Sequence, residues 1–417
     1  MTLDNFYSKK QIEILKKSQK EDWFIMINHG AVRAGKTQID NDLFLKELLR
    51  IKKIAKEDKV DKPMYILGGV SAGTLYTNIL RELEDKYDIT FKFDKYGNFS
   101  LFGVYVVTTF TGSIAGLRAI RGMTSYGAYI NEATLANKDV FDEIIKRCSG
   151  RGARIICDTN PDNPNHWLKV DYIDKAGSED GKKITEFHFN IFDNPFLDKG
   201  YVDNLIATTP KGMFTDRGIY GLWTIAEGAI YSDYDKSIHE IDTLPDMVRY
   251  FAGVDWGYDH YGSIVIIGED KRGNYYLVDG IAEQYKEIDW WVDRANEFKE
   301  HYGNIIFWSD SARPEHVARF QRERLKARNA NKSIVSGIEH IAKLLKENNL
   351  FIKREVIPRF FDEIYQYKWK PNSTKDEPLK EYDDVLDALR YALYSQWLID
   401  NRPTGNQFNV LRQGLGY

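Results

Sequence analysis

The sequence predicts an α/β protein of two domains, and three observations support this fold class. The chain has 417 residues, which suits two domains of roughly 150 to 250 residues each. Short apolar runs alternate with amphipathic stretches, a pattern typical of a parallel sheet covered by helices. This pattern loosens at about residues 228–245 and starts again near Tyr250. We therefore predict a first domain over 1–227, a linker over 228–245, a second domain over 246–400 and a flexible tail over 401–417.

The bulk composition indicates a globular protein without a membrane span. Hydrophobic residues make up 43% and charged residues 29% of the chain, and no run of about 18 apolar residues occurs. The first residues lack the basic and apolar parts of a signal peptide, and two cysteines, Cys148 and Cys157, favour a reducing cytoplasm. The net charge of −4 argues against a wholly basic DNA-binding surface, but it is compatible with a local basic track.

Four short apolar runs in the first half predict strands, because turn-forming residues flank each of them. They cover residues 23–27, 64–67, 127–130 and 154–157. Periodicity alone does not distinguish runs of this length from helix, so the assignment depends on the flanks.

A phosphate-binding loop is predicted at residues 30–37, where Gly-Ala-Val-Arg-Ala-Gly-Lys-Thr fits the pattern GxxxxGK[ST]. The loop follows the first predicted strand and precedes a helix-like stretch. In such a loop Gly30 and Gly35 let backbone N–H groups surround phosphate oxygens, Lys36 reaches the β- and γ-phosphates, and Thr37 binds Mg²⁺. The sequence thus predicts an ATP and Mg²⁺ site, against the alternative of a glycine-rich turn before an ordinary helix.

A second acidic strand end completes this prediction. The run over 127–130 is followed by Asn131 and Glu132, and Glu132 is placed to orient or deprotonate the attacking water. Most P-loop ATPases carry Asp where Asn131 stands. A neutral amide hydrogen-bonds a metal-bound water but adds no charge, so we expect Thr37 and the phosphates to hold most of the metal.

Four further residues are candidates for the nucleotide site. Arg33 lies inside the loop, close enough to meet a phosphate, and Arg121 is a candidate arginine finger toward a neighbouring subunit. A surface ion pair is the alternative for each arginine. Thr159 and Asn160 follow a predicted strand and face the crevice where a nucleotide lies, although a plain Asn-Pro turn explains them almost as well.

Acidic residues at defined positions distinguish the second half. Asp255 and Asp310 each follow a predicted strand, and Asp384 and Asp387 lie three residues apart on one face of a predicted helix. Such a set holds two divalent ions about 4 Å apart for phosphodiester hydrolysis. Oxygen ligands favour Mg²⁺ or Mn²⁺. Any one of these aspartates alone is equally well a strand-end cap.

Strands are also predicted at residues 251–254, 263–267, 275–278 and 305–308, with a hairpin turn at Gly273-Asn274. A basic stretch lies between the acids. Its members are Arg313, Arg319, Arg322, Arg324, Lys326, Arg328 and Lys332. It either neutralises DNA phosphates beside the metal site or forms a solvated helix face. Residues 333–338 read as a loop that opens a helix.

Taken in this order, the motifs resemble those of the large terminase subunit of tailed bacteriophages, a DNA-packaging ATPase and nuclease. The resemblance covers nearly the whole chain. The family's adenine-binding glutamine is matched by Gln11, its coupling motif by Thr159 and Asn160, and its trans-acting arginine by Arg121. It implies an N-terminal P-loop ATPase of the ASCE or RecA-like class with a mainly parallel sheet, followed by an RNase H-like α/β nuclease. Some relatives carry His where Asp384 stands.

The resemblance also implies the partners and the setting. Copies of the chain form a ring on the portal protein of the procapsid, drive double-stranded DNA inward and cut the concatemer, aided by a small terminase subunit. The expected location is the cytoplasm of the infected bacterial host, with no membrane. The alternatives are a P-loop helicase or translocase without nuclease activity, a non-catalytic assembly module, and a junction-resolving nuclease that would not need the first 220 residues.

Overall fold

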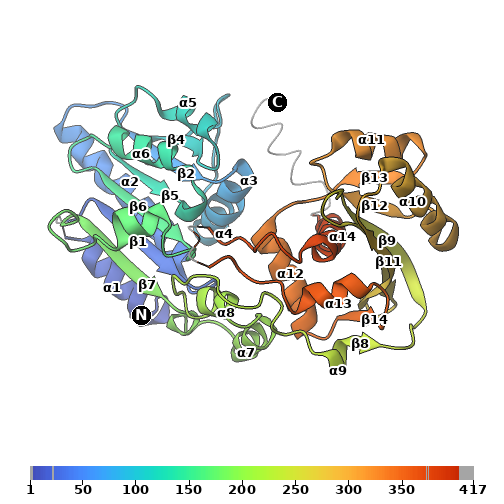
Figure 1. Cartoon of the computed structure of the whole chain (residues 1–417). Helices are drawn as coiled ribbons and strands as arrows, with labels where there is room; N and C mark the ends of the chain where they lie inside the picture. Colours follow the sequence, from blue (N-terminus) through green and yellow to red (C-terminus); the bar gives the residue numbers. More distant parts are fainter. Residues whose placement is uncertain (1–2, 21–22, 372, 374, 403–417) are drawn as a thin grey trace. The chain divides into compact units, whose positions relative to one another are not determined.

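The computed structural model describes residues 3–20, 23–371, 373 and 375–402, and its contacts divide the chain into two compact units. The first unit comprises Met1–Asp203 and Thr215–Ile225, and the second comprises Asn204–Phe214 and Ala226–Pro403. The expected tail over 401–417 lies outside the described residues from 403 onward. Among the described helices, none is both long and apolar enough to span a bilayer. Figure 1 labels the elements of each unit.

The first unit is built on a mainly parallel sheet of seven strands. In space the strands follow the order β3-β4-β2-β5-β6-β1-β7, and all neighbours are parallel except β3 and β4. The strand bounds are β1 Ile25–Gly30, β2 Met64–Gly69, β3 Phe99–Leu101, β4 Val104–Phe110, β5 Gly127–Ile130, β6 Arg154–Thr159 and β7 Ile184–Phe189. The four strands predicted in this half are confirmed as β1, β2, β5 and β6, with β1 beginning at Ile25.

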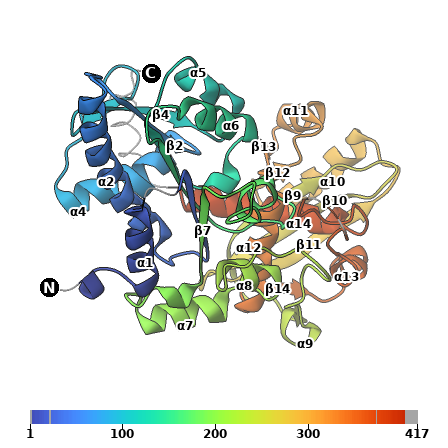
Figure 2. The ribbon, with the colours of Figure 1, turned by 90° about the vertical axis from the view of Figure 1, so that its left-hand side faces the viewer.

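Helices cover both faces of this sheet because successive side chains of each strand point to opposite sides. On one face Phe44 of α2 contacts the rings of Tyr65 and Tyr129. On the other face α5 and α6 pack on the alternate apolar residues of the strands. Figure 2 shows α2 on one side of the strands and α5 and α6 on the other. The helices are α1 Lys9–Ser18, α2 Lys36–Glu57, α3 Ala72–Leu75, α4 Arg81–Tyr87, α5 Leu117–Ile120, α6 Lys138–Arg147, α7 Lys199–Thr208 and α8 Met213–Gly218, with the π-helical turn η2 Tyr76–Leu80.

The second unit contains a mixed sheet of seven strands in the order β13-β12-β9-β10-β11-β14-β8. β10 is antiparallel to β9 and β11, and the other neighbours are parallel. The bounds are β8 Glu240–Ile241, β9 Met247–Asp255, β10 Gly262–Asp270, β11 Tyr275–Glu283, β12 Ile306–Ser309, β13 Lys326–Asn329 and β14 Leu350–Lys353. The predicted hairpin turn is confirmed, because Gly273 has φ 83° between the antiparallel strands β10 and β11.

Two helical layers enclose the second sheet. α10 Ile288–Tyr302 and α11 Pro314–Arg322 pack on one face. α12 Ile334–Lys346, α13 Pro358–Ile364 and α14 Asp384–Asp400 pack on the other. Residues 333–338 do open a helix, α12, as predicted. Residues 228–245, expected as a linker, include α9 Lys236–His239 and β8, and Ile230 and Tyr231 are buried in the core of this unit.

Candidate active sites

The loop between β1 and α2 has the backbone geometry of a phosphate cradle. Gly30 has φ 140°, and a Cβ there would lie 1.9 Å from the carbonyl oxygen of Phe189, so only glycine fits. Gly35 has φ 92° and stands immediately before the first residue of α2. The loop therefore leads into the N-terminus of a helix of 22 residues, which favours an anion.

Lys36 is held inside the cradle. Its Nζ donates to the carbonyl oxygens of Gly30 at 2.9 Å and Ala31 at 2.5 Å, and to Oδ1 of Asn160 at 3.0 Å. Burial lowers the pKa of Lys36 to about 8, opposed by the nearby carboxylates, of which Asp158 has the largest effect. A phosphate bound in the cradle would compensate this buried charge.

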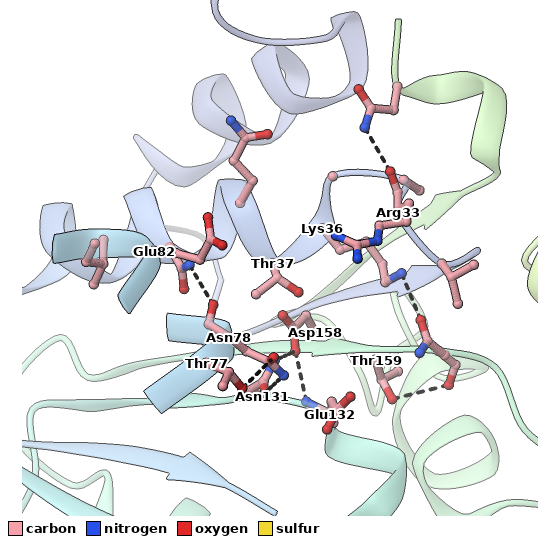
Figure 3. Close-up of a pocket in the computed structure, with 18 of the residues that line it drawn as sticks. Arg33, Lys36, Thr37, Thr77, Asn78, Glu82, Asn131, Glu132, Asp158 and Thr159 are labelled. Atoms are coloured by element: carbon pink, nitrogen blue, oxygen red, sulfur yellow. Dashed lines mark hydrogen bonds between the residues drawn. The ribbon is translucent and has the colours of Figure 1, made fainter. Parts of the chain in front are cut away.

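A cavity of about 670 Å³ opens above the loop, within the size range of small-molecule sites. Figure 3 shows Arg33, Lys36 and Thr37 on one side of it and Asn131, Glu132 and Asp158 on the other. Its lining residues are Val32, Arg33, Ala34, Gly35, Lys36, Thr37, Gln38, Asn41, Thr77, Asn78, Glu82, Leu83, Lys86, Asn131, Glu132, Asp158, Thr159, Asn160, Asn194 and Leu197.

Glu132 projects from the end of β5 in a backbone conformation that is uncommon for glutamate, with φ 54°. Burial raises the pKa of its carboxyl, and the charge of Asp158 adds to the rise. A half-buried carboxyl with a raised pKa is suited to accept a proton from water.

Asp158, near the end of β6, is a cavity carboxylate that was not among the predicted site residues. Its Oδ1 accepts from Nδ2 of Asn131 at 2.8 Å and from the backbone N–H of Glu132 at 2.9 Å, while its Oδ2 accepts from the hydroxyl of Tyr129 at 3.0 Å. The register of the strands places Asp158 here. β5 and β6 are parallel with Ile130 opposite Cys157, so Asn131 lies beside Asp158.

Thr159 and Asn160 both line the cavity. The hydroxyl of Thr159 forms a hydrogen bond with the hydroxyl of Thr134 at 2.6 Å, and Oδ1 of Asn160 accepts a hydrogen bond from the ammonium of Lys36. These residues therefore connect the segment after β5 with the loop lysine.

Gln11 lies beneath the loop and not in the cavity lining. Its Nε2 donates to the carbonyl oxygen of Gly35 at 2.9 Å, and its Oε1 accepts from the N–H of Ser8 in the N-terminal cap of α1. Among the arginines, Arg33 lines the cavity. Arg121 is an exposed residue at the end of α5 and is absent from the lining, a position in which it is open to a neighbouring molecule.

In the second unit, Asp255 and Asp384 are brought together by a close approach of α14 to β9. A Cβ on Gly253 would lie 1.9 Å from the carbonyl oxygen of Ala388, so glycine is required on the strand. Oxygen and nitrogen atoms of Asp255, Asp384 and His260 lie within 4.8 Å of one another. His260 Nδ1 is 3.1 Å from Oδ1 of Asp384. His260, in the loop after β9, was not a predicted site residue.

Asp310 and Asp387 lie near this group without joining it. Burial raises the pKa of Asp255 well above its ordinary value, and the charges of Asp387, Asp310 and Asp384 add to the rise in that order. Several carboxyls that repel one another in a partly enclosed site fit a divalent cation, because the cation removes the repulsion.

Basic side chains contact three of the four acids. Lys332 Nζ lies 2.5 Å from Asp310, Arg359 lies 3.2 Å from Asp384, and Arg390 lies 2.7 Å from Asp387. Within the basic stretch, residues 314–322 form α11 and residues 326–329 form β13. Lys332 belongs to the basic stretch of the sequence, which marks it as a candidate neighbour of the acids. No local sequence pattern marks Arg359 or Arg390 in this way.

α14 is anchored at the end that carries the acids. Glu363 of α13 accepts from the backbone N–H groups of Val385 at 2.8 Å and Leu386 at 3.1 Å. The same carboxyl pairs with Arg359 at 2.8 Å. Burial raises the pKa of Glu363 to about 7 despite these contacts. Glu363 therefore fixes the direction in which Asp384 and Asp387 face.

Two family models match the chain. One, described as "Terminase large subunit, T4likevirus-type, N-terminal", matches residues 35–235, and the other, "Terminase RNaseH-like domain", matches residues 252–396. The large terminase from a thermophilic bacteriophage aligns with a TM-score of 0.79 and 24% identity, covering 94% of this chain and 99% of that one. In complex with ADP the same terminase aligns with a TM-score of 0.78 and 25% identity, covering 96% and 100%. No curated protein matches the chain.

The fold, the two sites and the two family models together define a P-loop unit with a mainly parallel sheet, followed by an RNase H-like unit. Because the two family models together match most of its residues, the chain belongs to the family of phage large terminase subunits.

Proposed function

We propose that this protein packages phage DNA: it hydrolyses ATP to move double-stranded DNA and cleaves the DNA with its second unit. The observation that carries the proposal is the presence in one chain of a closed phosphate cradle with Glu132 opposite it and a carboxylate group around Asp255. A helicase or translocase would use only the first site.

In the first site the loop backbone and Lys36 bind the β- and γ-phosphates, and Thr37 would hold a Mg²⁺ ion, which would supply charge neutralisation at the phosphates. Glu132 accepts the proton of the attacking water. Arg33 contacts phosphate from within the loop, and Arg121 acts on the nucleotide of a neighbouring copy. Thr159 and Asn160 respond to the γ-phosphate through their contacts with Thr134 and Lys36.

Gln11 is the proposed adenine-binding residue. Both ends of its amide are occupied by protein groups, Ser8 and Gly35. Adenine recognition by this residue would use the second hydrogen bond that the oxygen and the nitrogen of an amide can each form.

In the second site Asp255, Asp310, Asp384 and Asp387 are the proposed carboxylates that would hold two Mg²⁺ or Mn²⁺ ions, and such ions would supply activation of water and charge stabilisation at the leaving oxygen. His260 is a candidate additional ligand. Asp387 is the most firmly paired of the four, because Arg390, its partner, is itself almost fully buried.

The proposed setting is the cytoplasm of an infected bacterium, with several copies assembled as a ring on the portal and a small terminase subunit selecting the DNA. The ATPase would lie within residues 1–227 and the nuclease within 246–400.

The nuclease proposal is tested by cleavage of supercoiled plasmid with Mn²⁺ or Mg²⁺. We expect metal-dependent cutting by the wild type, loss of cutting in Asp255→Asn and Asp310→Ala, and full cutting in Asp362→Asn, which removes an exposed carboxylate of α13 outside the cluster. Absence of cutting by a folded wild type that hydrolyses ATP would favour a plain translocase.

The ATPase proposal is tested by measuring phosphate release and nucleotide binding separately. Glu132→Gln should retain ATP binding but lose hydrolysis by about 10²- to 10⁴-fold, the usual contribution of a general base. Lys36→Ala should lose both. A Glu132→Gln variant that hydrolyses ATP at the wild-type rate would contradict the assigned base.

A further inference from the structure

Asn131, the first residue after β5, lacks the negative charge that a Mg²⁺-ATP site usually has at this position. Asn131 is neutral, and its amide makes one hydrogen bond at each end: Nδ2 donates to Asp158 at 2.8 Å, and Oδ1 accepts from Nδ2 of Asn78 at 3.0 Å. The side chain is buried and held by protein groups on both sides. It therefore adds no negative charge to the site.

The next strand supplies the missing carboxylate. Asp158 is the penultimate residue of β6 and lies directly beside Asn131, and it lines the same cavity as Lys36, Thr37 and Glu132. Figure 3 shows the Asp158 side chain between Thr37 and the pair Asn131 and Glu132. Its position is fixed by three donors, from Tyr129, Asn131 and Glu132.

The other buried carboxyl of this region is less suited to the role. Asp40 of α2 is fully buried, accepts from Asn28 and does not line the cavity. Burial, and next the charge of Asp158, raise the pKa of Asp40 well above its ordinary value, which favours its neutral form.

Asn131 and Asp158 form a matched pair. An amide at position 131 donates a hydrogen bond to the carboxylate of Asp158, which an ionised carboxylate cannot do. Two carboxylates in these places would repel each other at hydrogen-bonding distance. A neutral Asn131 after β5 is therefore compatible with a carboxylate at Asp158 of β6, whereas an aspartate at position 131 would not be.

We propose that Asp158, and not the β5 strand-end residue, provides the carboxylate that holds the Mg²⁺-bound water in this ATP site, with Asn131 as its positioning residue. The inference rests on the proposed ATPase function. It places the metal-directed carboxylate near the end of β6, whereas P-loop ATPases usually have it after the neighbouring strand, here β5.

The test measures the affinity of the full-length protein for a fluorescent ADP analogue with Mg²⁺ and with EDTA. The ratio of the two dissociation constants gives the Mg²⁺ enhancement of binding, a quantity that a purely structural role of Asp158 would leave unchanged. Asp158→Asn should reduce this enhancement by about 10- to 100-fold, as loss of an outer carboxylate partner does in metal sites, while binding in EDTA stays at the wild-type level. The matched control is Asp139→Asn, an exposed carboxylate in the first turn of α6.

A second variant tests the role of Asp158 if circular dichroism shows that Asp158→Asn does not fold. Asn131→Ala keeps the carboxylate of Asp158 and removes the amide. We expect it to retain most of the Mg²⁺ enhancement, whereas a site in which Asn131 itself holds the metal-bound water would lose it.

The double variant Asn131→Asp/Asp158→Asn exchanges donor and acceptor while keeping the hydrogen bond between the two side chains. It should restore the Mg²⁺ enhancement lost in Asp158→Asn.

The inference is overturned if a folded Asp158→Asn shows the wild-type Mg²⁺ enhancement, or if Asn131→Ala abolishes that enhancement. Failure of the ATPase proposal gives a different result, because the wild type itself would then bind no nucleotide.

Discussion

Burial of a single ammonium group makes nucleotide binding dependent on pH. The pKa of Lys36 is lowered to about 8, so the empty site begins to lose its positive charge as the pH rises through about 8. Phosphate binding favours the protonated form. We therefore expect the affinity for ADP in EDTA to fall by about tenfold for each pH unit well above 8. Titration of a fluorescent ADP analogue between about pH 7.5 and 9.5, where the phosphates of ADP are fully ionised, measures this.

The control for this prediction is Lys36→Met, which keeps an unbranched side chain one atom shorter and removes the charge. Its residual binding should be weak and independent of pH over the same range. A pH-independent affinity in the wild type would mean that Lys36 remains charged in the empty cradle, contrary to the effect of burial.

Lys332 provides a second residue-scale prediction, because its ammonium occupies Oδ1 of Asp310 at 2.5 Å. A divalent ion must compete with this contact. Lys332→Ala should therefore tighten Mn²⁺ binding without DNA by up to about fivefold, the effect expected for removal of a partly exposed ion pair. Isothermal titration calorimetry measures the affinity. Lys326→Ala, which removes another exposed lysine from the basic stretch, should have no effect. Weaker Mn²⁺ binding in Lys332→Ala would show that the lysine supports the site.

Among the elements, the packing of α14 on β9 controls the geometry of the second site. Because a Cβ at Gly253 would overlap a backbone carbonyl of α14, Gly253→Ala must displace the helix that carries Asp384 and Asp387. We expect a loss of about 1–3 kcal/mol in the free energy of unfolding, together with weakened Mn²⁺ binding. Chemical denaturation followed by circular dichroism measures the stability.

A second glycine gives the matched control. A Cβ at Gly73 of α3 would find its nearest neighbour at 3.7 Å, so Gly73→Ala should cost nothing measurable. Wild-type stability and Mn²⁺ affinity in Gly253→Ala would mean that α14 is free to move away from β9 without consequence for the acids.

The strands differ in how well the sequence predicts them. Central strands such as β2 and β5 are predictable, because they are continuous apolar runs between turn residues. β7 was missed, because it lies at the edge of the sheet and its burial pattern is mostly intermediate. Glu132 and Asp255 are predictable from strand ends. Asp158 directly follows the predicted strand over 154–157, so the same rule applies to it, whereas its place beside Asn131 follows only from the register of β5 and β6. His260 required the folded loop after β9.

At the scale of the whole molecule, each site lies in a unit with its own apolar core. A ligand that binds one folded unit stabilises that unit by about 2.7 kcal/mol at 100 times its dissociation constant. We therefore expect calorimetry of the full-length protein to show two unfolding transitions. Mg²⁺-ADP should raise the temperature of one, and Mn²⁺ without nucleotide should raise mainly the other, each by several degrees.

Variants assign the two transitions. Lys36→Ala should remove the shift caused by nucleotide and leave the Mn²⁺ shift intact, because the lysine contacts only groups of the phosphate cradle and its cavity. Asp255→Asn should do the reverse. It should also raise the second transition in the absence of metal, since it removes a buried carboxyl from a group of mutually repelling acids. A single transition shifted equally by both ligands would contradict independent units, and it would mean that binding at either site stabilises the chain as one cooperative body.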